Sequence, residues 1–427
     1  MRFTLTSREI TSCIVAIACS FFVSVAGAAE RSAYSAGAIK FSHQLLPTRV
    51  TNDFFVHVDD VNGDGYTDFV LTGYTPTSMQ PRGAQPSQVY LNNGDNTFKA
   101  ATGDGPPSEW AREMLVADFN GDNIKDLFFA DHGWDAAPFP GFKNQLLLGT
   151  ATGFTDATDQ LPDLNDFSHN AAAGDIDQDG DIDILVTNNP LSNADERSYF
   201  LMNDGAAHFT LDRSRLPASF AAMDPGQWSW AVELADLDND GWDDLIVGRK
   251  EDASSWPSRI HWNLGNGTFS DTAMTNLPDM ANFVSGGLYA VIEVQAFDVD
   301  NDGDKDVLLS AYDAGYQGLG IQLFTNGGSS APRTFVDQTQ SCLDGVTQLP
   351  DAGRDTPFFF RSMDINYDGL RDIVAFGGGN TNHNDNIVAF ENTGGDRLRA
   401  ITAGALTSDE DVRYRVTRFP LRGANEF

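Results

Sequence analysis

The chain has 427 residues, of which 41% are hydrophobic and 11% aromatic, and its formal net charge at pH 7 is −34. This composition is that of a globular protein that can bury a large core, and it excludes a disordered chain. The excess of acidic residues opposes nucleic acid and anionic membrane surfaces as partners and favours cations.

Residues 1–28 have the pattern of a cleavable signal peptide. Arg2 and Arg8 precede an apolar stretch at residues 10–25, and small residues follow at 26–29. We therefore expect a secreted or periplasmic protein. No later segment approaches the roughly 20 apolar residues of a membrane-spanning helix. The leader also holds Cys13 and Cys19, so the mature chain cannot form an internal disulfide, and metal ions are the expected cross-links.

Six acidic segments share one pattern and recur at intervals of 57 to 66 residues, beginning at Asp60, Asp118, Asp175, Asp236, Asp298 and Asp364. We name each loop by its first residue. Oxygen-bearing side chains stand at positions 1, 3, 5 and 9, glycine or asparagine stands at position 6, and an apolar run follows. Calcium takes about six to eight oxygen ligands, which alternate side chains of a tight turn supply. Position 6 needs a residue that tolerates positive φ. The pattern predicts calcium as the cofactor.

An EF-hand also begins with alternating aspartates, but it requires a bidentate glutamate at position 12 and a helix on either side. The residues at position 12 are Leu71, Phe129, Val186, Val247, Leu309 and Ala375. None of these side chains can bind a metal. The apolar runs that follow the loops are rich in β-branched residues, so we expect β-hairpins instead of helix pairs.

Each interval between loops contains four strand-like pieces. In the first interval, residues 54–58 enter the loop, residues 69–71 leave it, residues 89–91 run into an Asn-Gly turn, and the fourth piece opens on an aromatic residue. The residues predicted to open the fourth strand of each repeat are Phe98, Phe154, Phe209, Phe269, Phe335 and Leu398. Such periodicity indicates a repeat architecture.

Four antiparallel strands per repeat predict an all-β fold, a β-propeller of six calcium-loop blades that forms a single domain at residues 37–420. A propeller closes on itself and hides its sheet edges. Phe41 and the pair at 46–47 copy a fourth strand without a preceding loop, and this orphan strand would complete a blade begun at the C-terminus. Residues 412–416 are one more strand candidate, so a seventh, composite blade from both termini remains an alternative.

The loops, the apolar strands after them and the Leu-x-Asn-x-Gly turns resemble the FG-GAP/VCBS repeat family, which is related to the propeller at the N-terminus of integrin α chains. The resemblance covers roughly residues 37–400. No literal Phe-Gly…Gly-Ala-Pro signature occurs. The chain is therefore similar to the VCBS type, and cell adhesion of the integrin kind does not follow from the resemblance.

The resemblance implies side-chain ligands at positions 1, 3, 5 and 9 and a backbone carbonyl ligand at position 7. The implied metal ligands are Asp60, Asn62, Asp64, Tyr66 and Asp68; Asp118, Asn120, Asp122, Ile124 and Asp126; Asp175, Asp177, Asp179, Asp181 and Asp183; Asp236, Asp238, Asp240, Trp242 and Asp244; Asp298, Asp300, Asp302, Asp304 and Asp306; and Asp364, Asn366, Asp368, Leu370 and Asp372. The alternative is a set of acidic turns capped by their own side chains.

These calcium ions are expected to be structural, because the ligand sets contain no His or Cys of the kind that holds a catalytic zinc. Ligand charge sets calcium affinity, so loops with four carboxylates should bind more tightly than loops with three. The Asp118 loop, with Asn123 in place of glycine, is predicted to be the weakest.

If strands alternate in direction, the connections on the face opposite the calcium loops are free for a ligand. Candidate ligand-binding residues there are Trp110, Arg112, Trp134, Trp228, Trp230, Tyr289 and Arg354. Aromatic rings beside polar groups suit sugar rings and their hydroxyls. The alternative is that the aromatic residues pack between blades.

We therefore expect an exported, monomeric calcium-binding β-propeller that acts as a binding module for an extracellular glycan or protein. The alternative is a polysaccharide lyase or other carbohydrate-active enzyme on the same face, and a purely structural surface component is a third hypothesis. The sequence contains no Gly-x-Ser-x-Gly, no phosphate-binding loop and no His-Glu-x-x-His motif, so we assign no catalytic residues.

Overall fold

The structure is a computed structural model. It describes residues 54–66, 68–73, 84–94, 97–101, 105–135, 139–188, 197–221, 231–248, 257–279, 289–313, 320–344, 359–363, 369–376, 388–394 and 398–401. The expected signal peptide, the orphan strand at Phe41 and the strand candidate at 412–416 lie outside these residues.

All the described strands except β3 and β6 form six sheets that follow one another along the chain. Sheet 1 contains β1 (Phe54–Asp59), β2 (Asp68–Gly73), β4 (Gln88–Asn92) and β5 (Phe98–Ala100). Sheet 2 contains β7 (Ala111–Ala117), β8 (Asp126–Asp131), β9 (Gln145–Thr150) and β10 (Gly153–Asp156). Sheet 3 contains β11 (Ser168–Gly174), β12 (Asp183–Asn188), β13 (Tyr199–Met202) and β14 (Thr210–Asp212).

The second half of the chain repeats this arrangement. Sheet 4 contains β15 (Val232–Ala235), β16 (Asp244–Val247), β17 (Arg259–His261) and β18 (Met274–Asn276). Sheet 5 contains β19 (Tyr289–Phe297), β20 (Asp306–Asp313), β21 (Gly320–Asn326) and β22 (Phe335–Asp337). Sheet 6 contains β24 (Phe359–Met363), β25 (Asp372–Phe376), β26 (Val388–Asn392), β27 (Leu398–Ile401) and, at its outer edge, β23 (Leu343–Asp344).

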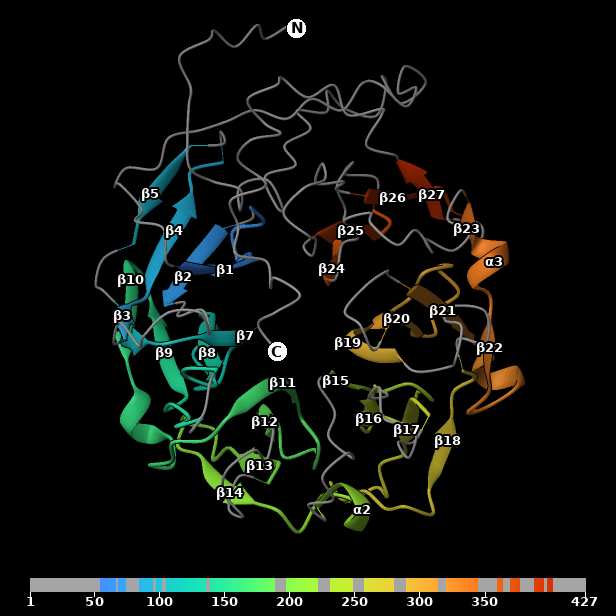
Figure 1. The fold of residues 1–427 in the computed structure, drawn as a ribbon, viewed down its shortest axis with the longest axis horizontal. Helices are drawn as coiled ribbons and strands as arrows, with labels where there is room; N and C mark the ends of the chain where they lie inside the picture. Colours follow the sequence, from blue (N-terminus) through green and yellow to red (C-terminus); the bar gives the residue numbers. More distant parts are fainter. Residues whose placement is uncertain are drawn as a thin grey trace, which may run out of the picture.

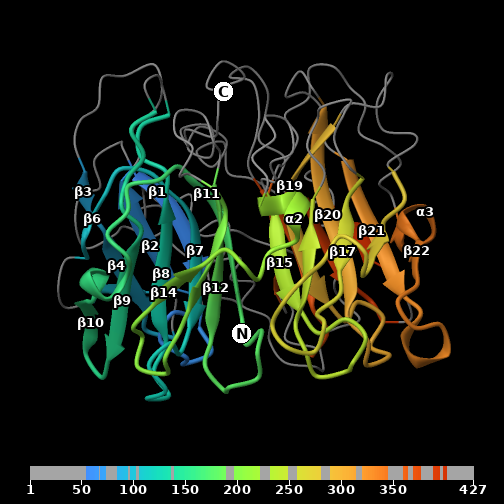
Figure 2. The same ribbon diagram turned by 90° about the horizontal axis from the view of Figure 1, so that it is seen from below.

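The six sheets are arranged around a common axis, with the first strand of each sheet nearest that axis (Figure 1). Neighbouring first strands contact one another from β1 through β7, β11, β15 and β19 to β24. Seen from the side, the strands run between the two faces of the molecule (Figure 2). This all-β arrangement is that of a β-propeller, as the repeat pattern predicted.

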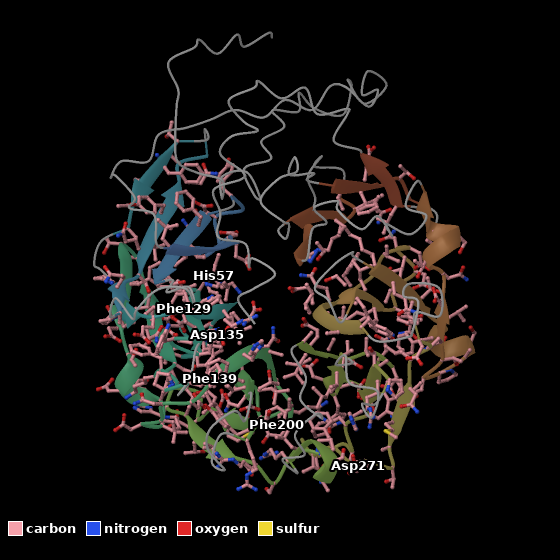
Figure 3. The ribbon with its side chains drawn as sticks, viewed as in Figure 1. His57, Phe129, Asp135, Phe139, Phe200 and Asp271 are labelled. Atoms are coloured by element: carbon pink, nitrogen blue, oxygen red, sulfur yellow. The ribbon has the colours of Figure 1, made fainter. Side chains whose placement is uncertain are left out.

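The second strand of a sheet is buried along its whole length in β2, β8, β12 and β16. A strand covered on both faces reads as a continuous apolar run, which explains why these segments lack alternation. The core therefore lies between sheets: Phe128 and Leu146 of sheet 2 pack in one cluster with Ile184 of sheet 3. Each such buried side chain contributes about 1.5–3 kcal/mol. Figure 3 shows side chains between the sheets and labels His57 of β1 and Phe129 of β8. The ring centroids of these two residues lie 6.1 Å apart.

Within the described residues, the helices are short connections: η2 (Thr158–Gln160), α2 (Ala218–Ala221), η3 (Gly328–Ser330) and α3 (Thr339–Cys342). In the described part of the chain, none of these is long and apolar enough to cross a bilayer. A small ribbon of β3 (Gln85–Pro86) and β6 (Pro107–Ser108) links the first two sheets.

One predicted strand start was wrong, since Phe269 precedes β18 by several residues. Phe209 lies one residue before β14. The backbone N–H of Phe269 donates to the carbonyl of Arg215, which follows β14 of sheet 3, at 2.8 Å, and that of Phe209 donates to the carbonyl of Gln160, in η2 after sheet 2, at 3.1 Å. Both backbones are thus bonded to a connection that follows the preceding sheet. Their rings are still buried, at 5% and 6% exposure, so the aromatic residues mark a contact between sheets.

Candidate metal sites and the opposite face

The acidic loops connect the first and second strands of each sheet. In the Asp60 loop, the two carboxylate oxygens of Asp60 accept the backbone N–H groups of Asp64, at 3.0 Å, and Gly65, at 2.8 Å. Asp64 in turn accepts the N–H of Tyr66 at 2.9 Å. The loops at Asp118, Asp236 and Asp298 repeat these bonds. The side chains therefore do cap the turn, and the same bonds hold them in a fixed arrangement.

Position 6 of the loops has positive φ, as the sequence predicted. The values are +85° at Gly65, +94° at Gly180, +91° at Gly241, +96° at Gly303, +88° at Gly369 and +66° at Asn123. Position 4 is also left-handed, which the sequence reading missed. These residues are Gly63, Gly121, Gln178, Asn239 and Asn301. Two left-handed residues in alternation turn the side chains of positions 1, 3 and 5 towards one centre.

The carboxylates at position 9 lie beneath the loops and are at most 1% exposed; they are Asp68, Asp126, Asp183, Asp244, Asp306 and Asp372. Asp68 accepts the backbone N–H of Val61 at 3.1 Å and that of Asn92 at 2.7 Å. Asp126, Asp244 and Asp306 accept the equivalent pair of bonds. Position 9 thus joins its own loop to the third strand of its sheet.

Burial also raises the pKa of these carboxyl groups, because desolvation disfavours the charged form. The pKa rises from 3.8 to about 7 at Asp68, about 6 at Asp126, about 7 at Asp183, about 8 at Asp244 and about 7 at Asp306. The backbone N–H donors oppose this rise, and the neighbouring loop carboxylates add to it. A cation beside each carboxylate would stabilise the charged form instead.

Three loops bring carboxylate oxygens close enough to share an ion. In each, three oxygens lie within 4.8 Å of one another: those of Asp175, Asp177 and Asp183; of Asp236, Asp238 and Asp244; and of Asp298, Asp300 and Asp302. In the Asp175 loop, Oδ1 of Asp175, Oδ1 of Asp177 and Oδ2 of Asp183 are buried and accept no hydrogen bond. Buried carboxylate oxygens without a donor are unfavourable unless a cation faces them. An all-oxygen set of this kind fits calcium.

The first two loops differ at position 3. The side-chain amide of Asn62 donates to Asp64 at 3.0 Å, and that of Asn120 donates to Asp122 at 3.2 Å. The asparagine is uncharged, so each of these two loops has one carboxylate fewer than a loop with aspartate at position 3. In the last loop, Asp364, Asn366 and Asp368 lie outside the described residues, whereas Asp372 accepts the N–H of Asn392 at 2.7 Å as its counterparts do.

An asparagine at the end of the third strand connects neighbouring loops, a role the sequence reading missed. The side-chain amide of Asn263 donates to the carbonyl of Ile176, position 2 of the preceding loop, at 2.9 Å. Asn203, Asn326 and Asn392 make the same bond to Phe119, Leu237 and Val299, at 2.8, 2.6 and 2.8 Å. The Leu-x-Asn-x-Gly turn was the available signal. We call these four residues the asparagine clamps.

The predicted ligand-binding residues on the opposite face differ in exposure. Trp110 and Tyr289 are 1% and 2% exposed, and the Tyr289 hydroxyl donates to Asp279 at 3.1 Å. Such burial favours the alternative of packing between sheets. Arg112 and Trp134 are half-buried. Trp228, Trp230 and Arg354 lie outside the described residues.

Arg112 belongs to a compact cluster with His132. Its guanidinium is 3.3 Å from Nε2 of His132 and 5.7 Å above the Trp110 ring. His132 is fully buried, and burial together with Arg112 holds its pKa well below 6.5, so the ring is neutral. The neighbouring Asp131 accepts backbone N–H groups from Trp110 and Gly133, at 2.8 and 2.9 Å. These bonds hold the backbone just before Arg112, which lies in β7, and just before Trp134, which follows β8.

A cavity of about 250 Å³ lies among the first strands of the sheets, near the axis. Its polar lining includes His57, Asp59, Glu113, Glu233 and Glu293. The sequence analysis did not single out these residues, because they come from four different repeats. Their side chains meet only because the first strands of the sheets surround the axis.

The sheets and loops define a repeat protein with a propeller-type fold. Comparison with protein families supports this assignment: a family model described as FG-GAP-like repeat matches residues 60–129 and 236–309. The chain therefore contains FG-GAP-like repeats, as the loop pattern indicated. A search of curated proteins found no match.

Among solved structures, the chain is similar to a lectin from Agrocybe aegerita, described for its specific recognition of non-reducing terminal N-acetylglucosamine. The identity is 18%, the TM-score is 0.50, and the alignment covers 86% of this chain and 84% of the lectin. A β-fructofuranosidase from Schwanniomyces occidentalis aligns at 11% identity and a TM-score of 0.38, covering 76% of this chain and 62% of the enzyme. The likeness to the lectin shows the fold.

Proposed function

We propose that this protein is an exported, calcium-stabilised β-propeller of six blades that binds an extracellular glycan or protein through the face opposite its acidic loops. The domain would span residues 37–420 after removal of residues 1–28, and the protein would be a monomer. The observation that carries the calcium assignment is the set of three buried, donor-free carboxylate oxygens in the Asp175 loop.

Calcium would act as a structural cross-link in this fold. Positions 1, 3, 5 and 9 of a loop, with the carbonyl of position 7, would hold the ion, which supplies positive charge to oxygens that otherwise repel one another. Position 9 already joins the loop to the third strand, and the asparagine clamp joins it to the next sheet. An ion in each loop would therefore stabilise both the hairpin and the contact between sheets.

A closed ring of six blades is supported by Asn92. It stands where the asparagine clamps stand in later sheets, is 2% exposed, and accepts the N–H of Gly94 at 3.0 Å as Asn263 accepts that of Gly265. In sheets 3 to 6 the amide of this residue donates to the preceding loop. A ring of six blades would place sheet 6 before sheet 1, so that Asn92 would have the same role towards the Asp364 loop.

Support for ligand binding on the opposite face comes from Arg112 and Trp134. Both side chains are half-buried, and the backbone next to each is held by hydrogen bonds to Asp131. A partly exposed indole can stack on a sugar ring, and a partly exposed guanidinium can donate to sugar hydroxyls. The lectin of similar fold makes terminal N-acetylglucosamine the first sugar to test.

The test is a glycan array probed with the mature protein in calcium and in EGTA, together with a polysaccharide-degradation assay. We expect binding to one glycan class that is lost in the Trp134→Ala variant and retained in Trp242→Ala, a matched tryptophan on the loop face. Binding that survives Trp134→Ala, or loss in both variants, would place the ligand elsewhere. Release of sugar products from a polysaccharide would instead establish that the protein is an enzyme. If the protein neither binds a glycan nor degrades a polysaccharide, the result would indicate a protein ligand.

A further inference from the structure

In two of the acidic loops, the aspartate at position 3 forms an ion pair with an arginine from outside the loop. Arg333 donates from Nε to Oδ2 of Asp238 at 2.6 Å, and its Nη2 lies 3.8 Å from Oδ2 of Asp240. Arg215 donates from Nη2 to Oδ2 of Asp177 at 2.9 Å. Both arginines thus place a permanent positive charge on a residue that the loop pattern assigns to the metal.

The position of Arg333 is built into the fold. It belongs to the turn before β22 in sheet 5, yet it reaches the Asp236 loop of sheet 4. Its guanidinium lies 4.7 Å above the ring of Trp262, and its backbone adopts a φ of +59°, which an arginine rarely does. Stacking and the ion pair together offset this backbone strain. Arg215 is similarly held, by Asp212 at 3.2 Å and the carbonyl of Gly267 at 3.2 Å.

The arginines distinguish these loops from the first two. There, position 3 is Asn62 or Asn120, which is uncharged and donates its amide to the carboxylate at position 5. In the Asp175 and Asp236 loops, position 3 is a carboxylate, but a guanidinium accompanies it. The extra negative charge is thus balanced within the protein. A count of carboxylates therefore overstates the attraction of these loops for a cation.

We propose that Arg333 and Arg215 are resident counter-ions that limit the metal affinity of the Asp236 and Asp175 loops. The proposal rests on the calcium binding proposed above. A guanidinium within a few ångströms of a divalent ion repels it and shares the oxygen that the ion would use. The arrangement keeps the carboxylates paired when calcium is scarce and brings the affinities of the loops closer together than their sequences indicate.

The Asp236 loop contains its own reporter. Trp242 stands at position 7, next to the expected ion, so tryptophan excitation should sensitise the luminescence of Tb³⁺ bound in this loop. Tb³⁺ serves as the probe, and competition with Ca²⁺ gives the calcium affinity. The Trp242→Phe variant assigns the signal, since it should lose most of the sensitised emission while remaining folded.

We expect Arg333→Gln to raise the affinity of the Trp242-reported site about tenfold at low ionic strength, and by less in 0.15 M salt, because salt screens the repulsion. Arg215→Gln changes the net charge by the same amount but contacts another loop, so it should leave this site within about twofold of wild type. Arg333→Lys, which keeps the charge, should also stay near wild type.

An unchanged or weaker affinity in Arg333→Gln would overturn the proposal, as would an equal rise in Arg215→Gln. Thermal unfolding of each variant in EDTA checks that it folds. Arg333→Gly, which suits the positive φ, replaces the glutamine variant if that one does not fold. Absence of any Tb³⁺ signal in the wild type, with a melting temperature insensitive to calcium, would refute the calcium assignment itself and not only the role of the arginines.

Discussion

The Asp118 and Asp236 loops occupy equivalent places in sheets 2 and 4, yet they differ at three points. The Asp118 loop has asparagine at position 3 and at position 6, where the Asp236 loop has Asp238 and Gly241. The third strand of sheet 4 ends in the clamp Asn263, whereas the equivalent residue of sheet 2 is Gly149, whose N–H donates to Asp126 at 2.7 Å.

The difference at Gly149 has a steric cause. A Cβ on this residue would lie 2.1 Å from the carbonyl oxygen of Lys125, so no side chain fits. Sheet 2 therefore has no clamp at this position that could bind the Asp60 loop before it. Loops with one consensus pattern are thus unequal in charge, in backbone strain and in their connection to the next sheet.

Removal of calcium should have the largest effect. We expect EGTA to lower the melting temperature by about 10 °C or more, because ions bound only by the folded state stabilise it by mass action. Hydrogen exchange should then quicken more in β16, beneath the Asp236 loop, than in β8, beneath the Asp118 loop. A melting temperature that does not change on chelation would contradict the metal assignment. Equal hydrogen exchange in β16 and β8 would mean that the Asp236 and Asp118 loops do not differ in this respect.

The pH dependence of the metal-free protein should be next in size. The pKa of Asp244 is about 8 and that of Asp126 about 6, against an ordinary value of 3.8. Between pH 4 and these values the folded chain holds protons that the unfolded chain has released, so stability falls as the pH rises. In EGTA we expect both Asp244→Asn and Asp126→Asn to reduce the fall in stability with rising pH. The reduction should be larger for Asp244→Asn, because the pKa of Asp244 is higher. Saturating calcium should flatten the slope, and a stability that rises with pH in EGTA would contradict the assignment.

Substitution of a position-9 carboxylate tests the joint between loop and third strand. Asp244→Ala removes the acceptor of two backbone N–H groups, from Leu237 and Asn263, and leaves both buried. We expect a loss of about 3 kcal/mol in the free energy of unfolding, measured by urea denaturation. Asp163→Ala, at a side chain 96% exposed, is the matched control and should change little. A similar loss in both variants would point to a general charge effect.

The asparagine clamp should contribute less to the free energy of unfolding than the position-9 carboxylate does. Asn263→Ala leaves the carbonyl of Ile176 without its inter-sheet donor, and we expect a loss of about 1–3 kcal/mol. The loss should be accompanied by faster exchange in the Asp175 loop, because the clamp joins the two sheets. Asn266→Ala, in the same turn, serves as the control. If the loss is confined to the Asp236 loop, the clamp does not couple neighbouring sheets.

The smallest effect is expected at position 6. Asn123 has a φ of +66°, which costs an asparagine more than a glycine. Asn123→Gly should therefore stabilise the protein by about 0.5 kcal/mol and bring the Asp118 loop closer to the others. The urea midpoint in calcium measures this gain. A lower midpoint would mean that the asparagine is preferred for a reason other than backbone conformation.

Much of the fold could be predicted from the chain because its signals are local. The acidic residues, the glycine at position 6 and the apolar run after each loop lie within about a dozen residues, and a tight turn followed by a strand depends on little else. The aromatic residues near the fourth strands were harder. Phe269 was predicted to open a strand, but its N–H donates to the carbonyl of Arg215, in the connection after the preceding sheet, a partner that local patterns do not reveal.

The sequence thus determined the repeat, the acidic turns and the all-β class, since each follows from residues close together in the chain. The tertiary structure decided which groups meet between repeats: the asparagine clamps on the preceding loops, Arg333 on Asp238, and the acidic lining of the axial cavity. These contacts join residues tens of positions apart. They depend on the angle and distance between neighbouring sheets, which the packing of their buried side chains sets.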